Sequence, residues 1–423
     1  MDGYNAVSLL GIVLLPGIAW VFSADRRKMN WRVIGWGIGI QLAFALFLFR
    51  APVAAKLFLF VNGAAVKVLG CAGKGTEFLF GPLATGSSGF ILAIQGLATI
   101  PFFSALVAVL YFTGVLPLMI RAFAAVFTWL MRVSGAESLC AASNIFVGIE
   151  SALTVKPHLS EMTRSELCTV LAVGMATVAS NVLLMYVSML KALFPNIAGH
   201  LISASLLSAP AALVMSKILL PETGAPKTLG TRVRPHYERE SSLFEAIING
   251  ANAGLRLVGG ICALLLAVLG LVALVNLLLG AVGGWVNSWT GWTVDWTLEG
   301  LLGCLFWPFA VIMGVPPADV GVVAKILGTR AVVTEIAGYQ QLAGALEAGR
   351  LMHPRSQVIA AYALCGFAHI ASMSIFVGGV AALVPERTRD LVAVGFRALV
   401  AATLACLLTG AVAGTFYTAG SGL

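Results

Sequence analysis

The chain has 423 residues and a formal charge of +8, with 59% hydrophobic and only 10% charged residues. Soluble domains carry about 25% charged residues, so this composition excludes an ordinary soluble enzyme and leaves room for about eight to ten membrane spans. The positive charge does not indicate a nucleic-acid partner, because the basic residues occur in short loops beside apolar runs, as membrane orientation signals do.

Apolar runs in the first third of the chain predict three membrane spans. Residues 5–22 and 33–49 form the first two, and a basic loop separates them. Residues 51–97 are less apolar and suggest an amphipathic helix followed by a Gly-rich stretch. A third span is expected over 100–118, and an amphipathic helix lying in the membrane interface is expected over 121–133.

Five further spans are expected in the remainder of the chain, over residues 165–190, 197–220, 243–282, 356–384 and 391–417. The run 243–282 is either one tilted helix or two pieces that meet at Gly259–Gly260. Two stretches, 134–157 and 298–343, mix apolar residues with Gly, Pro and charges. Irregular backbone at membrane depth must be buried in protein or line a cavity, so both are predicted to be re-entrant helical hairpins.

The positions of Lys and Arg orient the spans. Excess positive charge marks cytoplasmic loops, which places both termini outside. The Trp-rich run of Trp285, Trp289, Trp292 and Trp296 then falls on the outer face. The basic residues expected on the cytoplasmic side are Arg26, Arg27, Lys28, Arg121, Arg132, Lys156, Arg164, Lys227, Arg232, Arg234, Arg239, Arg387 and Arg389.

The two halves of the chain repeat each other weakly. Arg164-Ser165 begins one copy and Arg355-Ser356 begins the other, and a hairpin candidate precedes each copy. The orientation of the loops makes this an inverted repeat. Secondary transporters use such repeats and place their binding sites near the membrane midplane, at broken helices.

Three ionisable residues lie at membrane depth. Glu150 and Glu335 fall in the hairpin candidates, and His369 falls in the span 356–384. A charged group there costs roughly 2.5 to 3.5 kcal/mol and is tolerated mainly beside water or a bound ligand. These residues therefore indicate a route for a solute through the membrane.

Known enzyme motifs are missing from the sequence. It contains no GxSxG, P-loop or HExxH motif, and its five histidines and seven cysteines show no metal-ligand spacing. Two other classes stay open, namely a gated channel and a membrane-embedded enzyme that uses Glu150 and His369 as acid and base. We expect a transporter without an organic cofactor.

Several long motifs resemble those of the concentrative nucleoside transporter family. They are SNIFVGIESALTVKPHLSEMTRSEL, GMATVAS, FWPFAVIMGVPPADVGVVAKILGTRAVVTEIAGYQQLA, YALCGFAHIASMSIFVGGVAALVPER and FRALVAATLACLLTGAVAG. The likeness covers most of the chain from about residue 80 onward and extends more weakly to the N-terminus.

The resemblance implies an all-α membrane protein, with about eight transmembrane helices and two re-entrant hairpins, that forms a homotrimer in the bacterial inner membrane. It implies elevator-type import of nucleosides or nucleoside-like solutes, coupled to Na⁺ or H⁺. The implied domains are scaffold helices (1–118), the first transport repeat (119–220), a cytoplasmic loop with a long scaffold helix (221–296) and the second transport repeat (297–423).

The resemblance also implies two sets of binding residues. Sodium ligands carry over to the Asn144 side chain, the Val147 and Val178 carbonyls and the Thr177 hydroxyl. Oxygen ligands of these kinds suit a hard cation. Substrate contacts carry over to Glu150, Ser151, Val182, Glu335, Phe367, His369 and Ser372.

The substrate set departs from the family pattern. The first hairpin is one residue shorter and lacks the glutamine that contacts the base, while Thr334 and His369 stand where the family has asparagines. A site built to hydrogen-bond polar groups discriminates strongly among ligands, so these changes predict an altered nucleoside-like substrate. Arg330 is expected to face water or to pair with an acid such as Asp319.

Overall fold

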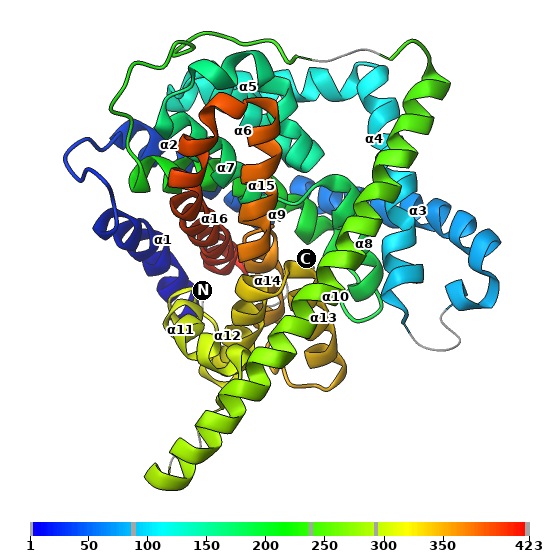
Figure 1. Cartoon of the computed structure of the whole chain (residues 1–423), viewed down its shortest axis with the longest axis vertical. Coiled ribbons are helices and arrows are strands. Elements are labelled where there is room, and N and C mark those ends of the chain that lie inside the picture. Colours follow the sequence, from blue (N-terminus) through cyan, green and yellow to red (C-terminus); the bar gives the residue numbers. More distant parts are fainter. Residues whose placement is uncertain (1–2, 86–89, 237–239, 292–294, 419–423) are drawn as a thin grey trace.

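The computed structural model describes residues 3–85, 90–236, 240–291 and 295–418, and every regular element within those ranges is a helix (Figure 1). This result confirms the predicted all-α class. The first half contains α1 (Gly3–Val21), α2 (Trp31–Arg50), α3 (Pro52–Phe80), η1 (Gly81–Thr85), η2 (Leu92–Gly96), η3 (Leu97–Thr99), α4 (Ile100–Phe112), α5 (Val115–Met131), α6 (Gly135–Val147), η4 (Gly148–Glu161), α7 (Arg164–Ala176), α8 (Ser180–Leu190) and α9 (Ile197–Leu219).

The second half begins with the longest helix, α10 (Leu243–Thr290), which has 48 residues. It is continuous through Gly259–Gly260, so the one-helix alternative is confirmed. The remaining elements are α11 (Leu298–Ile312), α12 (Pro317–Val332), α13 (Glu335–Glu347), α14 (Pro354–Leu364), α15 (Ile370–Leu383), η5 (Pro385–Arg387) and α16 (Thr388–Phe416).

Eight helices within the described ranges are long and apolar enough to cross a membrane. The number of spans agrees with the predicted eight, but one of the predicted spans is replaced by another segment. Pro52–Ala84 qualifies, although the sequence suggested only an amphipathic helix there. The predicted span 356–384 does not qualify, because residues 365–369 separate α14 from α15, a longer interruption than residues 177–179 within Arg164–Leu190.

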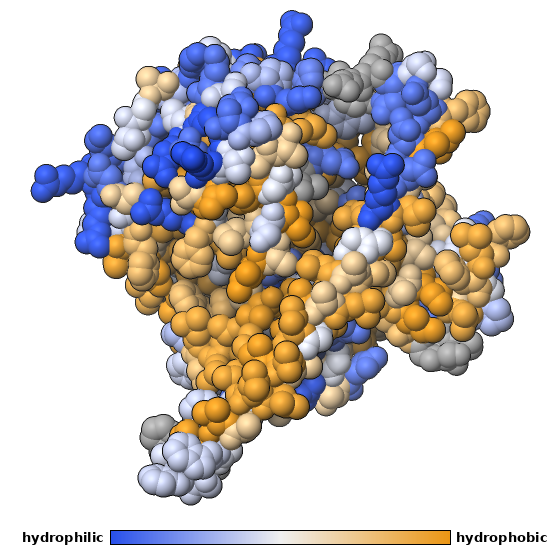
Figure 2. Space-filling model, viewed as in Figure 1, coloured by the Kyte–Doolittle hydropathy of each residue, from blue (hydrophilic) through white to orange (hydrophobic). Residues whose placement is uncertain are grey.

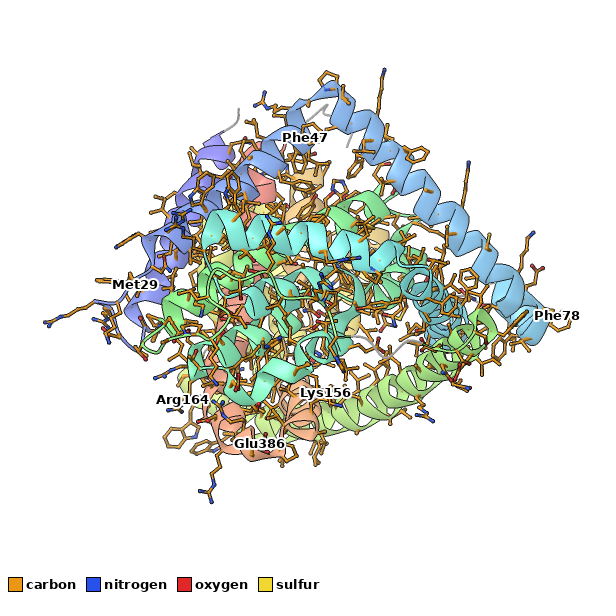
Figure 3. All side chains as sticks on the ribbon, turned by 90° about the horizontal axis from the view of Figure 1, so that it is seen from above. Met29, Phe47, Phe78, Lys156, Arg164 and Glu386 are labelled. Atoms are coloured by element: carbon orange, nitrogen blue, oxygen red, sulfur yellow. The ribbon has the colours of Figure 1, made fainter. Side chains whose placement is uncertain are left out.

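α3 lies at the edge of the molecule. Seen from above, it runs from near Phe47 to Phe78 along one side (Figure 3), and in Figure 1 it lies nearly horizontal. Its spaced charges, Lys56, Lys67 and Lys74, lower the average hydropathy of this segment, which is why the sequence suggested an amphipathic helix and not a membrane span.

The predicted span 100–118 is wrong at its end. α4 stops at Phe112, and Gly114, whose φ is +81°, turns the chain into α5. A residue with a side chain rarely adopts this φ, so Gly114 suits the turn. The predicted domain boundary at residue 118 therefore falls inside α5.

Both predicted hairpins exist, with adjusted limits. In the first, α6 reverses at Gly148, whose φ is +66°, and η4 returns. In the second, the reversal lies at Val333–Thr334, between α12 and α13. α11 is a separate helix packed against α12, so the predicted stretch 298–343 contained more than the hairpin. The hairpins lie toward opposite ends of the molecule (Figure 1).

The two repeats anchor their hairpins in the same way. Glu137 and Asp319 are each the third residue of the hairpin's first helix, and both are buried. Asp319 accepts a hydrogen bond from Ser356 at 2.6 Å. Glu137 and Ser165 both contact the Lys217 ammonium, at 2.5 and 2.9 Å. Ser165 and Ser356, which the repeat aligns, thus both meet the acidic residue of the preceding hairpin, Ser356 directly and Ser165 through Lys217.

Loops predicted to be cytoplasmic lie together on one polar face. Arg387 donates hydrogen bonds to the Ser160 and Met162 carbonyls, at 2.8 and 2.7 Å, and Arg164 lies 3.4 Å from Asp390. Figure 2 shows this face as the hydrophilic upper part of the molecule, above a broad hydrophobic zone. In Figure 3 it faces the viewer, with Lys156, Arg164 and Glu386 labelled.

The two ends of the chain lie side by side. The Asn5 amide donates hydrogen bonds to the carbonyls of Thr415 and Tyr417, both at 2.8 Å. Trp285 and Trp289 are exposed at the end of α10, Trp296 packs on Gly283, and Trp292 lies outside the described residues. That the termini face outside stays a prediction.

We predict that Lys217→Met lowers the free energy of unfolding by about 3–5 kcal/mol, because it leaves the Glu137 carboxylate buried without a cation. Adding Glu137→Gln should restore much of the loss. Thermal unfolding of the purified protein in detergent measures both. Lys325→Met is the control, since its partner Asp295 is exposed and such pairs contribute about 0–1 kcal/mol. Equal destabilisation by both lysine substitutions would contradict the prediction.

Candidate functional site

The candidate site lies where two interrupted helices meet. One interruption separates α7 from α8 at residues 177–179, and the other separates α14 from α15 at residues 365–369. The interruptions are in close contact, because a Cβ on Gly366 would lie only 2.8 Å from the Ala176 carbonyl oxygen. The tip of the first hairpin also reaches this point, since a Cβ on Gly148 would lie 2.6 Å from the Ala179 Cβ.

Oxygen atoms gather between α6 and the end of α7. The Asn144 amide donates to the Val173 carbonyl at 2.6 Å and to the Thr177 hydroxyl at 2.5 Å. The Thr177 hydroxyl lies 3.3 Å from the Asn144 carbonyl. Asn144 Oδ1 is buried and has no hydrogen-bond partner. An unpartnered buried carbonyl oxygen beside a hydroxyl and helix-end carbonyls suits a hard cation, so these residues fit sodium.

The other predicted cation ligands lie beside this cluster. Val147 is the last residue of α6, at the reversal of the hairpin, and Val178 is buried within the interruption after α7. The four residues predicted from the sequence are therefore brought to one place, and their role as ligands stays a prediction.

A second cluster surrounds Glu335, the first residue of α13. Glu335 is fully buried, and the Tyr186 hydroxyl of α8 donates to its Oε1 at 2.6 Å. His369 Nε2 approaches Glu335 Oε2 at 3.1 Å, although the angle falls short of a hydrogen bond. Side chains from the second hairpin and from both broken helices thus enclose one carboxylate.

His369 also caps α15. Its Nδ1 accepts a hydrogen bond from the Ser372 backbone N–H at 3.2 Å, and the Ser372 hydroxyl donates to the His369 carbonyl at 2.6 Å. Because Nδ1 acts as an acceptor, the proton of the neutral ring is on Nε2, facing Glu335. Ser372, predicted to contact substrate, therefore holds His369 in position.

Aromatic rings enclose the Glu335 cluster. Tyr186 stacks on Tyr339 with ring centroids 4.4 Å apart, and Phe367 lies edge-on to His369 at 4.7 Å. Val182 lies one helical turn before Tyr186 and is almost fully buried. Apolar walls lower the local dielectric, which strengthens every hydrogen bond to Glu335.

Glu150 lies in a separate cavity of about 250 Å³. The cavity is bounded by the first hairpin, α4, α8 and α10, and Tyr111, Asn181, His236 and Asn249 contribute polar groups. Glu335 and His369 do not line it. Ser151 is buried away from the cavity, beside Cys140. The predicted substrate residues are therefore divided between an open cavity and the closed Glu335 cluster.

Several residues of these sites were not singled out from the sequence, among them Tyr186 and Asn181. Tyr186 lies four residues after Val182, and Asn181 directly precedes Val182. Residues four apart share one face of a helix, so that spacing was a usable signal for Tyr186. Arg330 was wrongly expected to face water or pair with Asp319, because it is fully buried and Asp319 bonds Ser356.

A helical membrane protein with two inverted hairpin repeats and buried polar clusters at its broken helices is a membrane transporter of the inverted-repeat class. The comparisons agree. The family model described as "Na+ dependent nucleoside transporter C-terminus" matches residues 200–414, its N-terminal counterpart matches 10–83, and a "Nucleoside recognition" gate model matches 93–193. The chain belongs to the concentrative, Na⁺-dependent nucleoside transporter family.

Relatives of known name support this assignment. The chain is 35% identical to the "Nucleoside permease NupC" of Helicobacter pylori, with 97% of each chain covered. It is 34% identical to an "Uncharacterized transporter" of Haemophilus influenzae, with 98% of each covered. It is also 34% identical to the "Sodium/nucleoside cotransporter 1" of Rattus norvegicus, where 97% of this chain spans 64% of the longer relative.

Solved structures share the whole fold. The structure of CNTnw in an inward-facing substrate-bound state matches with a TM-score of 0.88 and 34% identity over 98% of each chain. A doubly substituted CNTnw in an outward-facing state matches with a TM-score of 0.87 and 32% identity over 98% of each chain. These relatives are transporters, and no comparison points to an enzyme.

We predict that Tyr186→Phe weakens nucleoside uptake into proteoliposomes by roughly tenfold, because a hydrogen bond to a charged group is worth about 1.5–3 kcal/mol. Tyr339→Phe is the matched control. Its ring stacks on Tyr186, but its hydroxyl donates to the Ala361 carbonyl at 3.0 Å instead of to Glu335. Equal loss from both substitutions would show that packing, and not the bond to Glu335, is responsible.

Proposed function

We propose that the chain is a secondary active importer of nucleosides or nucleoside-like solutes, driven by sodium symport. The observation that carries this proposal is the enclosure of Glu335 by Tyr186 and His369 where both broken helices meet the second hairpin. Tyr186 holds Oε1 of this carboxylate, and its Oε2 has no hydrogen-bond partner, so Oε2 can accept a hydrogen bond from a sugar hydroxyl. The family resemblance assigns the same carboxylate to the ribose.

Sodium is favoured as the coupling ion by the cluster at Asn144. Asn144 Oδ1 lacks a hydrogen-bond partner, and a small rearrangement would direct it, the Thr177 hydroxyl and nearby carbonyls toward one cation. Such a cation would neutralise the negative ends of α6 and α7, where the helix dipoles terminate. Proton coupling through His369 is the alternative, because its imidazole lies 3.1 Å from the Glu335 carboxylate.

The substrate should be a small nucleoside-like solute. The Glu150 cavity of about 250 Å³ lies just below the range of about 300–1,000 Å³ typical of sites for drug-sized ligands. The shortened first hairpin lacks the glutamine that the family resemblance leads one to expect, and Thr334 and His369 stand where the family has asparagines. We therefore propose that base and sugar recognition differ from those of the family's usual members.

Movement of the hairpins past α10 is the proposed transport step. α10 packs mainly on α4, and its apolar contact with the second hairpin is small, formed by Val268 and Val272 against Val332, Val333 and Ala337. A small apolar contact permits sliding, as an elevator mechanism requires. The Glu150 cavity lies on the same boundary, between α10 and the first hairpin.

A homotrimer in the bacterial inner membrane is the proposed assembly, with both termini outside. Most large apolar side chains of α10 are exposed in the single chain, including Leu266 (78%) and Leu277 (68%). Patches of this kind mark contacts with lipid or with other subunits. A long helix with such a surface suits the trimer interface that the family resemblance implies.

Sodium-driven uptake is the direct test. We predict that proteoliposomes with an inward sodium gradient accumulate labelled nucleosides saturably and that Glu335→Gln reduces uptake at least about tenfold, because it removes the charged acceptor. Uptake driven only by a pH gradient would mean that the coupling ion is a proton and not sodium. Flux that does not saturate would favour the gated channel, and no flux from a folded protein would place the substrate outside the nucleosides.

His369→Asn tests whether the substrate is altered. It restores the residue that the family resemblance leads one to expect and removes the imidazole that approaches Glu335. We predict that this substitution broadens uptake toward ordinary nucleosides, measured as relative initial rates across a panel of nucleosides, nucleobases and modified nucleosides. An unchanged ranking across the panel would mean that His369 does not determine specificity.

A further inference from the structure

Arg330 is a fully buried charge that the proposed mechanism does not use. It lies in the last turn of α12, and its Nη1 donates to the Ala363 carbonyl at 2.8 Å. Its Nε and Nη2 have no hydrogen-bond partner, and within the described ranges no ion pair includes it. Burying a charge without a counter-ion is costly, so the surroundings must stabilise it in another way.

The surroundings of Arg330 are the negative ends of two helices. Ala363 lies in the last turn of α14, and Ala176, the last residue of α7, is adjacent through Gly366. The Cys365 and Cys406 thiols and the Tyr339 hydroxyl are within electrostatic reach of the guanidinium. Helix C-termini carry about half a negative charge each, so a cation is stabilised at this position.

The inverted repeat makes Arg330 the counterpart of Asn144. Asn144 lies seven residues after the anchoring Glu137, and Arg330 lies eleven after the anchoring Asp319. The difference of four residues is about one helical turn, so both side chains lie on the same face relative to their anchors.

The acceptors also correspond. Asn144 donates to the Val173 carbonyl, eight residues after Ser165, and Arg330 donates to the Ala363 carbonyl, seven residues after Ser356. In each repeat, the hairpin's first helix therefore sends an N–H donor to the carbonyl end of the broken helix.

The two donors differ in charge. Asn144 is neutral, and its unpartnered Oδ1 leaves room for an exchangeable cation. Arg330 carries a permanent charge, which repels a mobile cation. We infer that Arg330 is a built-in cation that occupies, in the second repeat, the position that the exchangeable cation takes in the first, so the protein has one exchangeable cation site. The inference rests on the proposed sodium site at Asn144 and makes Arg330 a positioning residue.

Sodium-dependent thermal unfolding of the full-length protein tests this inference. A ligand that binds only the folded state raises the free energy of unfolding in proportion to the logarithm of the ligand concentration. The slope of this dependence is proportional to the number of sites. NaCl is titrated at constant ionic strength, with KCl as the replacement salt. Wild type should show the sodium dependence of one site. Arg330→Gln, which resembles Asn144, should show about twice that slope, whereas Arg330→Lys should match wild type.

The outcomes are distinguishable. An Arg330→Gln slope equal to that of wild type would overturn the inference, as would an Arg330→Gln protein that fails to fold at every sodium concentration while Arg330→Lys folds. Failure of both variants to fold would also overturn it, because the shape of the guanidinium would then matter more than its charge. The double variant Asn144→Leu/Arg330→Gln should return to the slope of one site.

Failure of the proposed sodium coupling gives a different pattern. In that case wild type shows no sodium response, and the inference still requires Arg330→Gln to gain the response of one site. The ratio of labelled sodium to labelled nucleoside transported provides a second readout, which should rise from one toward two in Arg330→Gln. A merely structural role of Arg330 would change stability without changing either the slope or this ratio.

Discussion

Two helices that stop inside the protein impose the constraint on which the rest of the structure depends. α7 ends at Ala176 and α14 ends at Leu364, and each leaves carbonyl groups that no further helical turn can satisfy. Water and lipid cannot satisfy them at membrane depth. The protein supplies donors from the hairpins, namely the Asn144 amide for α7 and the Arg330 guanidinium with the Tyr339 hydroxyl for α14.

The hairpins must then be held at a fixed distance from the broken helices. Otherwise the side-chain donors would lose their hydrogen bonds to the carbonyl groups at the ends of α7 and α14. An acidic residue near the start of each hairpin meets a serine near the start of the next broken helix, as Glu137 does with Ser165 through Lys217 and Asp319 does with Ser356. These polar contacts lie near the outer ends of the helices, and the donors lie at the tips. Each hairpin is therefore held in place where its first helix begins, and its hydrogen-bond donors lie at its tip.

Much of this arrangement could be predicted from the sequence. Apolar runs located most helices, and the Gly- and Pro-containing stretches located both hairpins. Asn144 and Thr177, two of the predicted cation ligands, lie together as expected. Predictions failed where the composition of a segment does not determine how that segment folds or packs. The spaced lysines of α3 lowered its hydropathy, so it was not predicted to be a membrane span. α11 was not separated from the second hairpin, because it has a similar content of Gly and Pro. The separation of Glu150 from Glu335 and the burial of Arg330 depend on packing, which hydropathy does not report.

The length of α10 makes its tilt sensitive to the thickness of the membrane. A helix of 48 residues is about 72 Å long, whereas the hydrocarbon core of a bilayer is about 30 Å thick. α10 therefore extends beyond the core unless it is tilted, and it runs obliquely across the molecule in Figure 1, so we expect its tilt to change with bilayer thickness. Because Asn249 and Gly250 of α10 form one wall of the Glu150 cavity, such a rotation would change the shape of that cavity. We therefore expect the acyl-chain length of the surrounding lipid to influence the Glu150 cavity.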